Sequence, residues 1–298
     1  MRLTRLTDWL EAQRDIDCVG QPLNGVVQRL LPAGPVKNAL TGTWLGHPLH
    51  PVLVMVPIGS WTSASLIDVA VGRSTTAARR LIGLGVVAAV PSALSGLADW
   101  SDTGGSEQRV GVAHATLNTV ALALYSASWW SRRRAEAAGG AGTAGAVLAL
   151  AGMAVATGAG YLGGHLIYAQ GVGVDTNAFH SGPDDWTTVA AIDDLPDEGA
   201  LAVTAGNARL LLVGQGAQIW ALENRCSHRG APLSDGTVED GCVTCPWHGS
   251  RFDLRTGEVV AGPATVGQPV YETKVVAGQI QVRRQEERSL RTNPDGPG

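Results

Sequence analysis

The chain has 298 residues, enough for about two domains. Only 16% of the residues are charged, whereas 45% are hydrophobic and 39 are glycine, a balance that excludes a disordered chain and favours membrane segments. The net charge of −4 argues against a nucleic-acid partner, because phosphate binding needs a basic surface, and four cysteines are too few for a disulfide scaffold.

The first 46 residues are predicted to form an N-terminal tail. They contain one amphipathic helix, LTRLTDWLEAQRDI, followed by a connection rich in proline and glycine. The polar start lacks the apolar core of a secretory signal peptide, so we expect no cleaved leader. Cys18 lies in this segment, and no role is assigned to it.

Residues 47–172 are predicted to form a domain of four transmembrane helices. The region holds only five acidic residues and seven arginines, nearly all in short clusters between long uncharged runs. A helix needs about 20 apolar residues to cross the roughly 30 Å hydrocarbon layer, and each run supplies close to that number. The spans are expected near residues 51–71, 81–100, 110–130 and 143–169.

Two compositional features bear on the solvent of these helices. Gly, Ala and Ser are dense within the spans, and small residues allow helices to approach closely in lipid. A soluble helical bundle is the alternative, but it would need a polar face on each helix, which the stretch 81–97 lacks.

Two strings at the borders of this region carry a family resemblance. They are GHPLHPVLVMVPIGSW near the first span and YLGGHLIYAQGVGV at the end of the last. With them the region resembles a family of small four-helix bacterial membrane proteins of unknown function. The resemblance implies the four-span topology and a place in the bacterial plasma membrane, but no activity.

Four histidines are expected to gather at one membrane face. His47 and His50 begin the first span, His114 lies about one turn into the third, and His165 lies about one turn before the end of the fourth. Ionisable residues at membrane depth are rare and suggest function. Four interpretations stay open: a bis-His b-type haem, a non-haem metal, a quinone pocket, and interfacial histidines that cap helices or contact headgroups.

Arginines predict the sidedness of the domain. The first and third interhelical loops each carry three arginines, whereas the second, SDTGGSEQR, carries one. The positive-inside rule therefore predicts that loops one and three are cytoplasmic and that both termini and the C-terminal domain lie outside. The string SRRR at 131–134 resembles a twin-arginine export signal, unless its arginines only anchor the loop. Asp68, at the far end of the first span, is expected to be interfacial.

The chain changes character after a linker at residues 173–185. From 186 to 284, short apolar stretches alternate with Gly, Asp and Pro turns, which is typical of an all-β domain. Residues 285–298 are interpreted as a disordered tail. The predicted fold class is thus a membrane α-helical bundle joined to an all-β domain.

The β domain contains two Cys–His pairs that could hold metal. Cys226-Ser-His228 is followed, after sixteen residues, by Cys245-Pro-Trp-His248. Two thiolates and two imidazoles suit either a tetrahedral zinc ion or a [2Fe–2S] cluster with cysteines on one iron and histidines on the other, and the spacing does not decide between them. Cys242 is expected to be a small buried apolar residue rather than a ligand.

The flanking sequences, RCSHRGAPLSDG and CPWHGSRFDLRTG, closely resemble the two cluster-binding loops of the Rieske family. The resemblance covers residues 186–284 and implies a Rieske-type [2Fe–2S] cluster. It implies that Cys226 and Cys245 hold the buried iron, and that His228 and His248 hold the iron nearest the solvent.

The same resemblance implies roles around the cluster. Gly230 and Gly249 would let backbone amides approach the sulfurs, although both also suit plain turns. Ser250 matches a residue that donates a hydrogen bond to a bridging sulfide, whereas Phe252 stands where a tyrosine would donate to a cysteine sulfur. Trp247 takes the place of one disulfide cysteine of high-potential members. A reduction potential between oxygenase-type and respiratory-type values is therefore expected.

These features predict a membrane-anchored electron-transfer protein rather than a self-contained catalyst. The cluster would pass single electrons between a membrane donor, such as a quinol or a haem or metal site at the histidine face, and an unknown redox partner protein. Two alternatives stay open: a redox sensor, and the ferredoxin component of a membrane oxygenase or reductase system. A Rieske oxygenase would need a further iron site with two histidines and a carboxylate, for which the β domain is too short.

Overall fold

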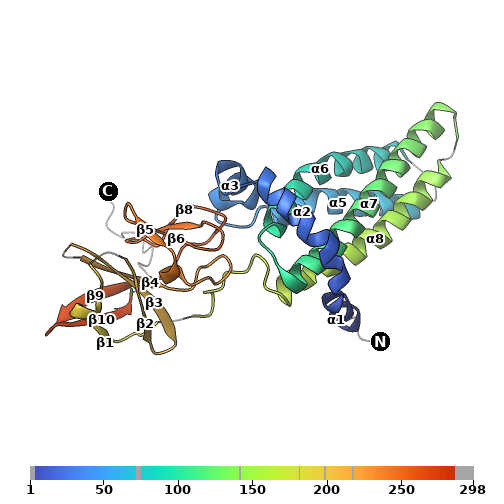
Figure 1. The fold of residues 1–298 in the computed structure, drawn as a ribbon. Helices are drawn as coiled ribbons and strands as arrows, with labels where there is room; N and C mark the ends of the chain where they lie inside the picture. Colours follow the sequence, from blue (N-terminus) through green and yellow to red (C-terminus); the bar gives the residue numbers. More distant parts are fainter. Residues whose placement is uncertain are drawn as a thin grey trace, which may run out of the picture. The chain divides into compact units, whose positions relative to one another are not determined.

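The computed structural model describes residues 4–71, 75–140, 142–180, 182–197, 199–216 and 218–285. The chain divides into two compact units, residues 1–174 and 175–298, and Figure 1 shows the long helices in the first and the strands in the second. The predicted combination of four apolar helices with an all-β domain is therefore confirmed. Apart from residue 285, the predicted C-terminal tail lies outside the described residues.

Four long helices form the first unit: α5 (Met55–Val71), α6 (Thr76–Trp100), α7 (Gly105–Ala137) and α8 (Thr143–Tyr168). The short helix α4 (His50–Leu53) leads into α5, and all four spans are long and apolar enough to cross a membrane. Helices α6 and α7 extend beyond their predicted spans, 81–100 and 110–130. The added residues include charged ones, which can continue a helix although they do not belong to the apolar span. Helix α6 begins earlier, at Thr76, and α7 is longer at both ends. Helix α7 ends close to Gly139, whose left-handed φ of +70° is typical of a helix C-terminus.

Small and aromatic side chains fill the interior of the helical unit, and large aliphatic side chains point outward. Trp61 and Tyr125 stack with ring centroids 4.4 Å apart, and a Cβ at Gly85 would lie 2.3 Å from the indole nitrogen of Trp61. Val87 and Val147 are 70% and 62% exposed. A soluble bundle buries such valines, so this distribution favours lipid as the solvent of the outer surface.

A buried ion pair joins α5 to α7. Arg132 donates from Nη1 to Oδ1 of Asp68 at 2.9 Å and from Nη2 to Oδ2, while its Nε donates to Oγ of Ser128 at 3.1 Å. The side chains of Arg132 and Asp68 are 0% and 1% exposed. Asp68 is therefore a core residue rather than an interfacial one. Arg132 lies within α7 and its side chain is buried between the helices, so it does more than anchor a loop.

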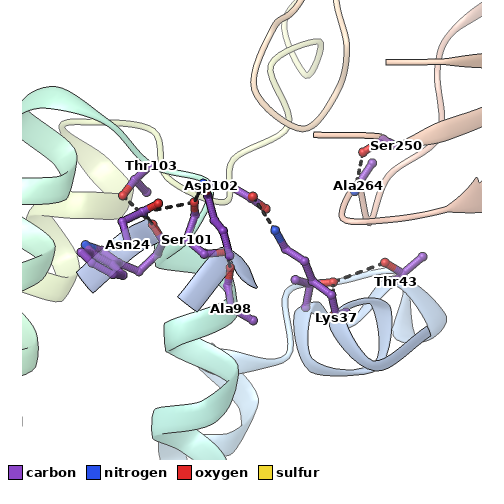
Figure 2. A network of polar contacts seen from close by, with 12 residues as sticks. Asn24, Lys37, Thr43, Ala98, Ser101, Asp102, Thr103, Ser250 and Ala264 are labelled. Atoms are coloured by element: carbon purple, nitrogen blue, oxygen red, sulfur yellow. Dashed lines mark hydrogen bonds and ion pairs between the residues drawn. The ribbon is translucent and has the colours of Figure 1, made fainter. Parts of the chain in front are cut away.

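The N-terminal segment is more ordered than a tail. It forms three helices and two 3₁₀ turns: α1 (Thr4–Ala12), η1 (Arg14–Ile16), α2 (Asp17–Leu30), α3 (Pro35–Thr41) and η2 (Thr43–Leu45). Figure 2 shows two of its polar contacts: Asn24 donates to the Ser101 carbonyl at 3.1 Å, and Lys37 forms a 2.5 Å ion pair with Asp102. Because the last carbonyls of a helix lack partners within it, the contact from Asn24 caps α6, and both contacts hold the segment against the bundle.

In its described part, the second unit contains two antiparallel sheets. The larger has the strand order β1-β10-β9-β4-β3-β2, made of β1 (Thr187–Ala191), β2 (Leu201–Ala205), β3 (Ala208–Gln215), β4 (Gln218–Glu223), β9 (Val270–Val276) and β10 (Gln279–Arg284). The smaller has the order β5-β6-β7-β8, made of β5 (Thr237–Glu239), β6 (Cys242–Thr244), β7 (Arg251–Asp253) and β8 (Val259–Ala261). Two further 3₁₀ turns are η3 (Ile192–Asp194) and η4 (Leu233–Asp235).

One hydrophobic core lies between the two sheets. Leu211 of β3 and Leu222 of β4 share it with Phe252 of β7, and all three are fully buried. Cys226 and Cys245 belong to the same core. The packing that joins the sheets therefore also fixes the position of the two sulfurs.

We expect the Arg132→Met substitution to destabilise the helical unit by about 3–5 kcal/mol, because it leaves the Asp68 carboxylate buried without its partner. Arg133→Met is the matched control: Arg133 is exposed above the Trp129 ring, so its loss should cost less than about 0.5 kcal/mol. Unfolding of the purified chain in mixed micelles with dodecyl sulfate measures both. The double variant with Asp68→Leu should recover most of the loss, and equal effects of Arg132→Met and Arg133→Met would contradict the assignment.

Candidate functional site

The two Cys–His loops adopt nearly the same turn. In each, the N–H of the cysteine donates to the carbonyl five residues later, at 2.8 Å for Cys226 and 2.7 Å for Cys245. The cysteine carbonyl in turn accepts from the N–H of the glycine four residues later, Gly230 at 2.8 Å and Gly249 at 3.1 Å. Both glycines have left-handed φ values, +77° and +76°. Glycine is favoured there because a side chain strains that conformation, so both residues act as turn formers.

These turns direct backbone amides at the sulfurs. Cys226 Sγ accepts from the N–H groups of His228 and Arg229, and Cys245 Sγ accepts from those of Trp247 and His248. The donors are in both loops the residues two and three positions after the cysteine. The two roles predicted for the glycines, forming a turn and letting amides approach the sulfurs, are thus connected. Each glycine closes the turn that places the two N–H groups next to the sulfur. Such hydrogen bonds stabilise negative charge on sulfur.

The two thiols are buried next to each other. Cys226 and Cys245 are 1% and 3% exposed and are joined by a hydrogen bond between their side chains. Donation from the Cys226 thiol lowers the pKa of Cys245 to about 6. The same bond, together with burial, raises the pKa of Cys226.

The two imidazoles form a second pair nearer the surface. The ring centroids of His228 and His248 lie 5.0 Å apart and the rings are nearly perpendicular, at 87°. Both residues are half-buried. Trp247 is 59% exposed, and its ring centroid lies 6.3 Å from that of His248. The sulfurs are thus held inside and the rings face outward, as the sequence implied.

The grouping of these donors fits a two-iron cluster better than a single zinc ion. The thiols lie together and the rings lie together, as two pairs. Across the described ranges, no three His, Cys, Asp or Glu side chains converge closely enough to hold one metal ion. A [2Fe–2S] cluster takes two cysteines on one iron and two histidines on the other, which is the pairing found here. The residues present therefore fit the cluster.

Two buried residues beside the loops bear on the reduction potential. Ser250 is fully buried, and its Oγ accepts from the N–H of Ala264 at 2.9 Å (Figure 2). This contact orients the hydroxyl and leaves its hydrogen to donate to a second acceptor. Phe252 is also fully buried but offers no hydroxyl. Cys242 lies buried on β6, and Cys18 is exposed on α2.

The sequence did not reveal which residues hold the first loop. Thr176 donates from Oγ1 to the Cys226 carbonyl at 2.8 Å, and Asn177 donates from Nδ2 to the Arg225 carbonyl at 2.7 Å. Ser227 donates from Oγ to the Val266 carbonyl at 2.6 Å. Thr176 and Asn177 fall in the segment predicted as a linker, yet they are part of the second unit. No local sequence signal identifies Thr176 and Asn177, because polar residues in a segment rich in Gly and Asp are typical of a solvent-exposed turn.

The structure separates the four membrane histidines into different environments. His50 and His114 are half-buried, and each has Nδ1 next to a backbone carbonyl of a neighbouring helix, that of Ser92 at 2.9 Å and that of Ala159 at 2.8 Å. His165 instead pairs through Nε2 with Glu11 of α1 at 2.6 Å, and His47 is exposed. The four histidines therefore have different partners, on α6 for His50, on α8 for His114 and on α1 for His165.

Two family models match this chain. Residues 185–272 match the Rieske [2Fe-2S] domain, and residues 46–176 match the family described as predicted membrane protein DUF2231. Both resemblances drawn from the sequence are thereby confirmed.

Individual relatives cover the C-terminal third of the chain. The ferredoxin subunit of anthranilate 1,2-dioxygenase from Burkholderia cepacia is 38% identical over 98 residues, which are 33% of this chain and 91% of that protein. The ferredoxin component of the naphthalene 1,2-dioxygenase system from Pseudomonas aeruginosa is 30% identical over 99 residues, 33% and 95% of the two chains.

Among solved structures, the ferredoxin of carbazole 1,9a-dioxygenase from Nocardioides aromaticivorans IC177 aligns with 34% of this chain and 98% of its own, at 29% identity and a TM-score of 0.33. Through its second unit, this chain belongs to the Rieske [2Fe-2S] family, here joined to a DUF2231 membrane domain.

Proposed function

We propose that this protein is a membrane-anchored one-electron carrier. The observation that carries the proposal is the pair of matched loops, which bury two thiols and turn two imidazoles outward. A bound [2Fe–2S] cluster supplies reversible one-electron chemistry. The amides two and three residues after each cysteine hold charge on the sulfurs, and the imidazoles shape the edge at which a partner protein docks.

Of the alternatives, the ferredoxin-like role has the stronger support. The relatives from Burkholderia cepacia and Pseudomonas aeruginosa are ferredoxin parts of dioxygenase systems, and each matches the second unit over most of its own length. They differ from this chain in that the matched region is here preceded by four apolar helices. We therefore propose an electron donor in the bilayer, a quinol or a haem near His50 and His114, and a redox protein as acceptor.

We further propose that the second unit lies outside the plasma membrane. Arg79, Arg133 and Arg134 lie near the ends of α6 and α7 that loops one and three join. Ion pairs occur at both ends, since Arg79 is paired with Glu136 at this end, and Lys37 with Asp102 and Arg109 with Asp17 at the opposite end. The positive-inside rule counts basic residues close to the span ends and so favours a cytoplasmic position for loops one and three.

Loss of either buried thiol should abolish the cluster. We expect Cys226→Ala and Cys245→Ala to lose the EPR signal of the dithionite-reduced protein, whereas Cys242→Ala, an equally buried cysteine three residues before Cys245, should keep it. Chemical analysis of the unmodified chain should find about two iron and about two acid-labile sulfide per chain. Zinc without sulfide would refute the cluster.

A hydroxyl at position 252 should raise the reduction potential, because a hydrogen bond to sulfur favours the more negative, reduced cluster. A bond that favours the reduced form by about 1.4 kcal/mol raises a one-electron potential by about 59 mV. We therefore expect Phe252→Tyr to shift the potential upward by roughly that amount and Ser250→Ala to shift it downward. Redox titration followed by EPR measures both, and shifts of the same sign would contradict the assigned role of hydroxyl donors.

Cys18 offers a natural test of sidedness, because it is exposed whereas the other three cysteines are buried. A membrane-impermeant maleimide should label Cys18 in intact spheroplasts. In a Cys18→Ser background, Gly140→Cys should be labelled only after permeabilisation; Gly140 is exposed in loop three, and a Cβ there meets no atom closer than 3.6 Å. The reverse labelling pattern would place the second unit in the cytoplasm.

A further inference from the structure

Helix α2 of the N-terminal segment packs on the bundle through one narrow face. Gly20, Asn24 and Val27 are buried, and residues three and four apart lie on the same face of a helix. A Cβ at Gly20 would lie 3.4 Å from Oε1 of Gln108 and 3.5 Å from Cγ2 of Val112, both on α7. The glycine therefore lets α2 lie close against α7.

Polar contacts fix the rotation of α2 about its own axis. At its first residue, the Asp17 carboxylate accepts from Nη1 of Arg109 at 3.0 Å. Near its last turn, Gln28 donates from Nε2 to the Ser101 carbonyl at 2.8 Å, and Asn24 donates to the same carbonyl at 3.1 Å. Because α2 is held at both ends and between them, the direction of its other faces is set.

A second face of α2 carries large apolar side chains that the bundle leaves exposed. Their spacing of four, three and four positions forms a stripe along the whole helix, and their exposed fractions run from 45% to 75%. This α2 stripe consists of Val19, Leu23, Val26 and Leu30. Single exposed apolar residues are ordinary, whereas a continuous stripe indicates a surface that contacts something apolar.

The third face of α2 is polar. Cys18, Gln21 and Arg29 lie there, and all three are exposed. The helix thus presents one face to the protein, one apolar face outward and one polar face outward. An outward surface that is divided in this way is typical of a helix that lies in the plane of the membrane interface.

The depth of α2 agrees with such a position. Ser101 directly follows α6, and Gln108 lies in the first turn of α7, so α2 contacts the ends of two spans. Figure 1 shows α2 crossing the long helices at this end of the bundle. The hydrocarbon layer ends where the spans end, so lipid is the apolar material beside the α2 stripe.

Two tryptophans provide a second, independent observation. Trp9 of α1 is 58% exposed, and Trp44 of η2, just before the first span, is 68% exposed. Helix α1 lies at the same end of the bundle, because Nε of Arg109 donates to the Glu11 carbonyl at 2.8 Å. Tryptophan is enriched at membrane–water interfaces, where its ring is apolar and its N–H is wet.

We propose that α2 is an interfacial membrane helix, with the α2 stripe among lipid acyl chains and the polar face in water. This inference does not depend on the proposed electron transfer and extends the lipid-contacting part of the chain beyond the four spans. Helix α2 carries one acidic and one basic residue, Asp17 and Arg29, so it needs no anionic lipid. An anchor of this kind sets the depth and tilt of the bundle.

The test measures the surroundings of single spin labels in the full chain, reconstituted into phosphatidylcholine vesicles. Leu23→Cys in a Cys18→Ser background carries the label on the α2 stripe, and the native Cys18 carries it on the polar face, because the other three cysteines are buried. Oxygen concentrates in hydrocarbon, whereas a nickel chelate stays in water. We expect the ratio of oxygen to nickel collision rates to be at least about threefold higher at position 23 than at position 18.

A second pair of variants guards against disturbance by one substitution. Val26→Cys should behave like Leu23→Cys, and Gln21→Cys should behave like the native Cys18. Nickel access at positions 23 and 26 equal to that at 18 and 21 would show that the α2 stripe faces water and would overturn the proposal. Low access of both oxygen and nickel at 23 and 26 would show that protein covers the stripe, which would also overturn it. Absence of a cluster EPR signal would instead count against the electron-transfer function and leave the lipid contact standing.

Discussion

The second unit depends on one backbone constraint that is used twice. A left-handed residue four positions after each cysteine closes a turn, and that turn points two N–H groups at the sulfur. Gly230 and Gly249 satisfy the constraint without strain, whereas any residue with a Cβ would meet a steric cost at the same φ. The positions of the two sulfurs and of the rings beyond them follow from this repeated turn. Because both cysteines also belong to the core between the sheets, the site is as rigid as the fold itself.

The helical unit is held together in a different way, because the hydrophobic effect does not drive apolar side chains together when lipid is the solvent. Its helices meet through glycine and aromatic contacts, as at Gly85 beneath Trp61, and through the ion pair between Arg132 and Asp68. Glycines also position His50 and His114, because the His50 ring lies against Gly96 and the His114 ring lies against Gly163. Glycines therefore serve both the close packing of the helices and the placement of these two imidazoles.

The sequence predicts those features that depend on local spacing. The proposed ligands Cys226, His228, Cys245 and His248 lie within two short turns, and the spans follow from uncharged runs, so local sequence is enough to predict both. Contacts between distant segments were not. From the sequence, Arg132 is interpreted as a residue that anchors a loop. Its partner Asp68 lies 64 residues earlier, and only the fold places the two side chains in contact. Thr176 and Asn177 are predicted to lie in a linker, because the carbonyls to which they donate hydrogen bonds are about 50 residues away in the sequence. Polar residues of this kind carry no periodic signal that could distinguish them from solvated ones.

The ion pair between Asp68 and Arg132 also constrains how the protein enters the membrane. Asp68 is near the end of the first span and Arg132 near the end of the third, so this ion pair can form only after the third helix has been synthesised. A carboxylate at that depth is costly in lipid. The settled position of the first span in the bundle therefore depends on a residue that follows Asp68 by 64 positions.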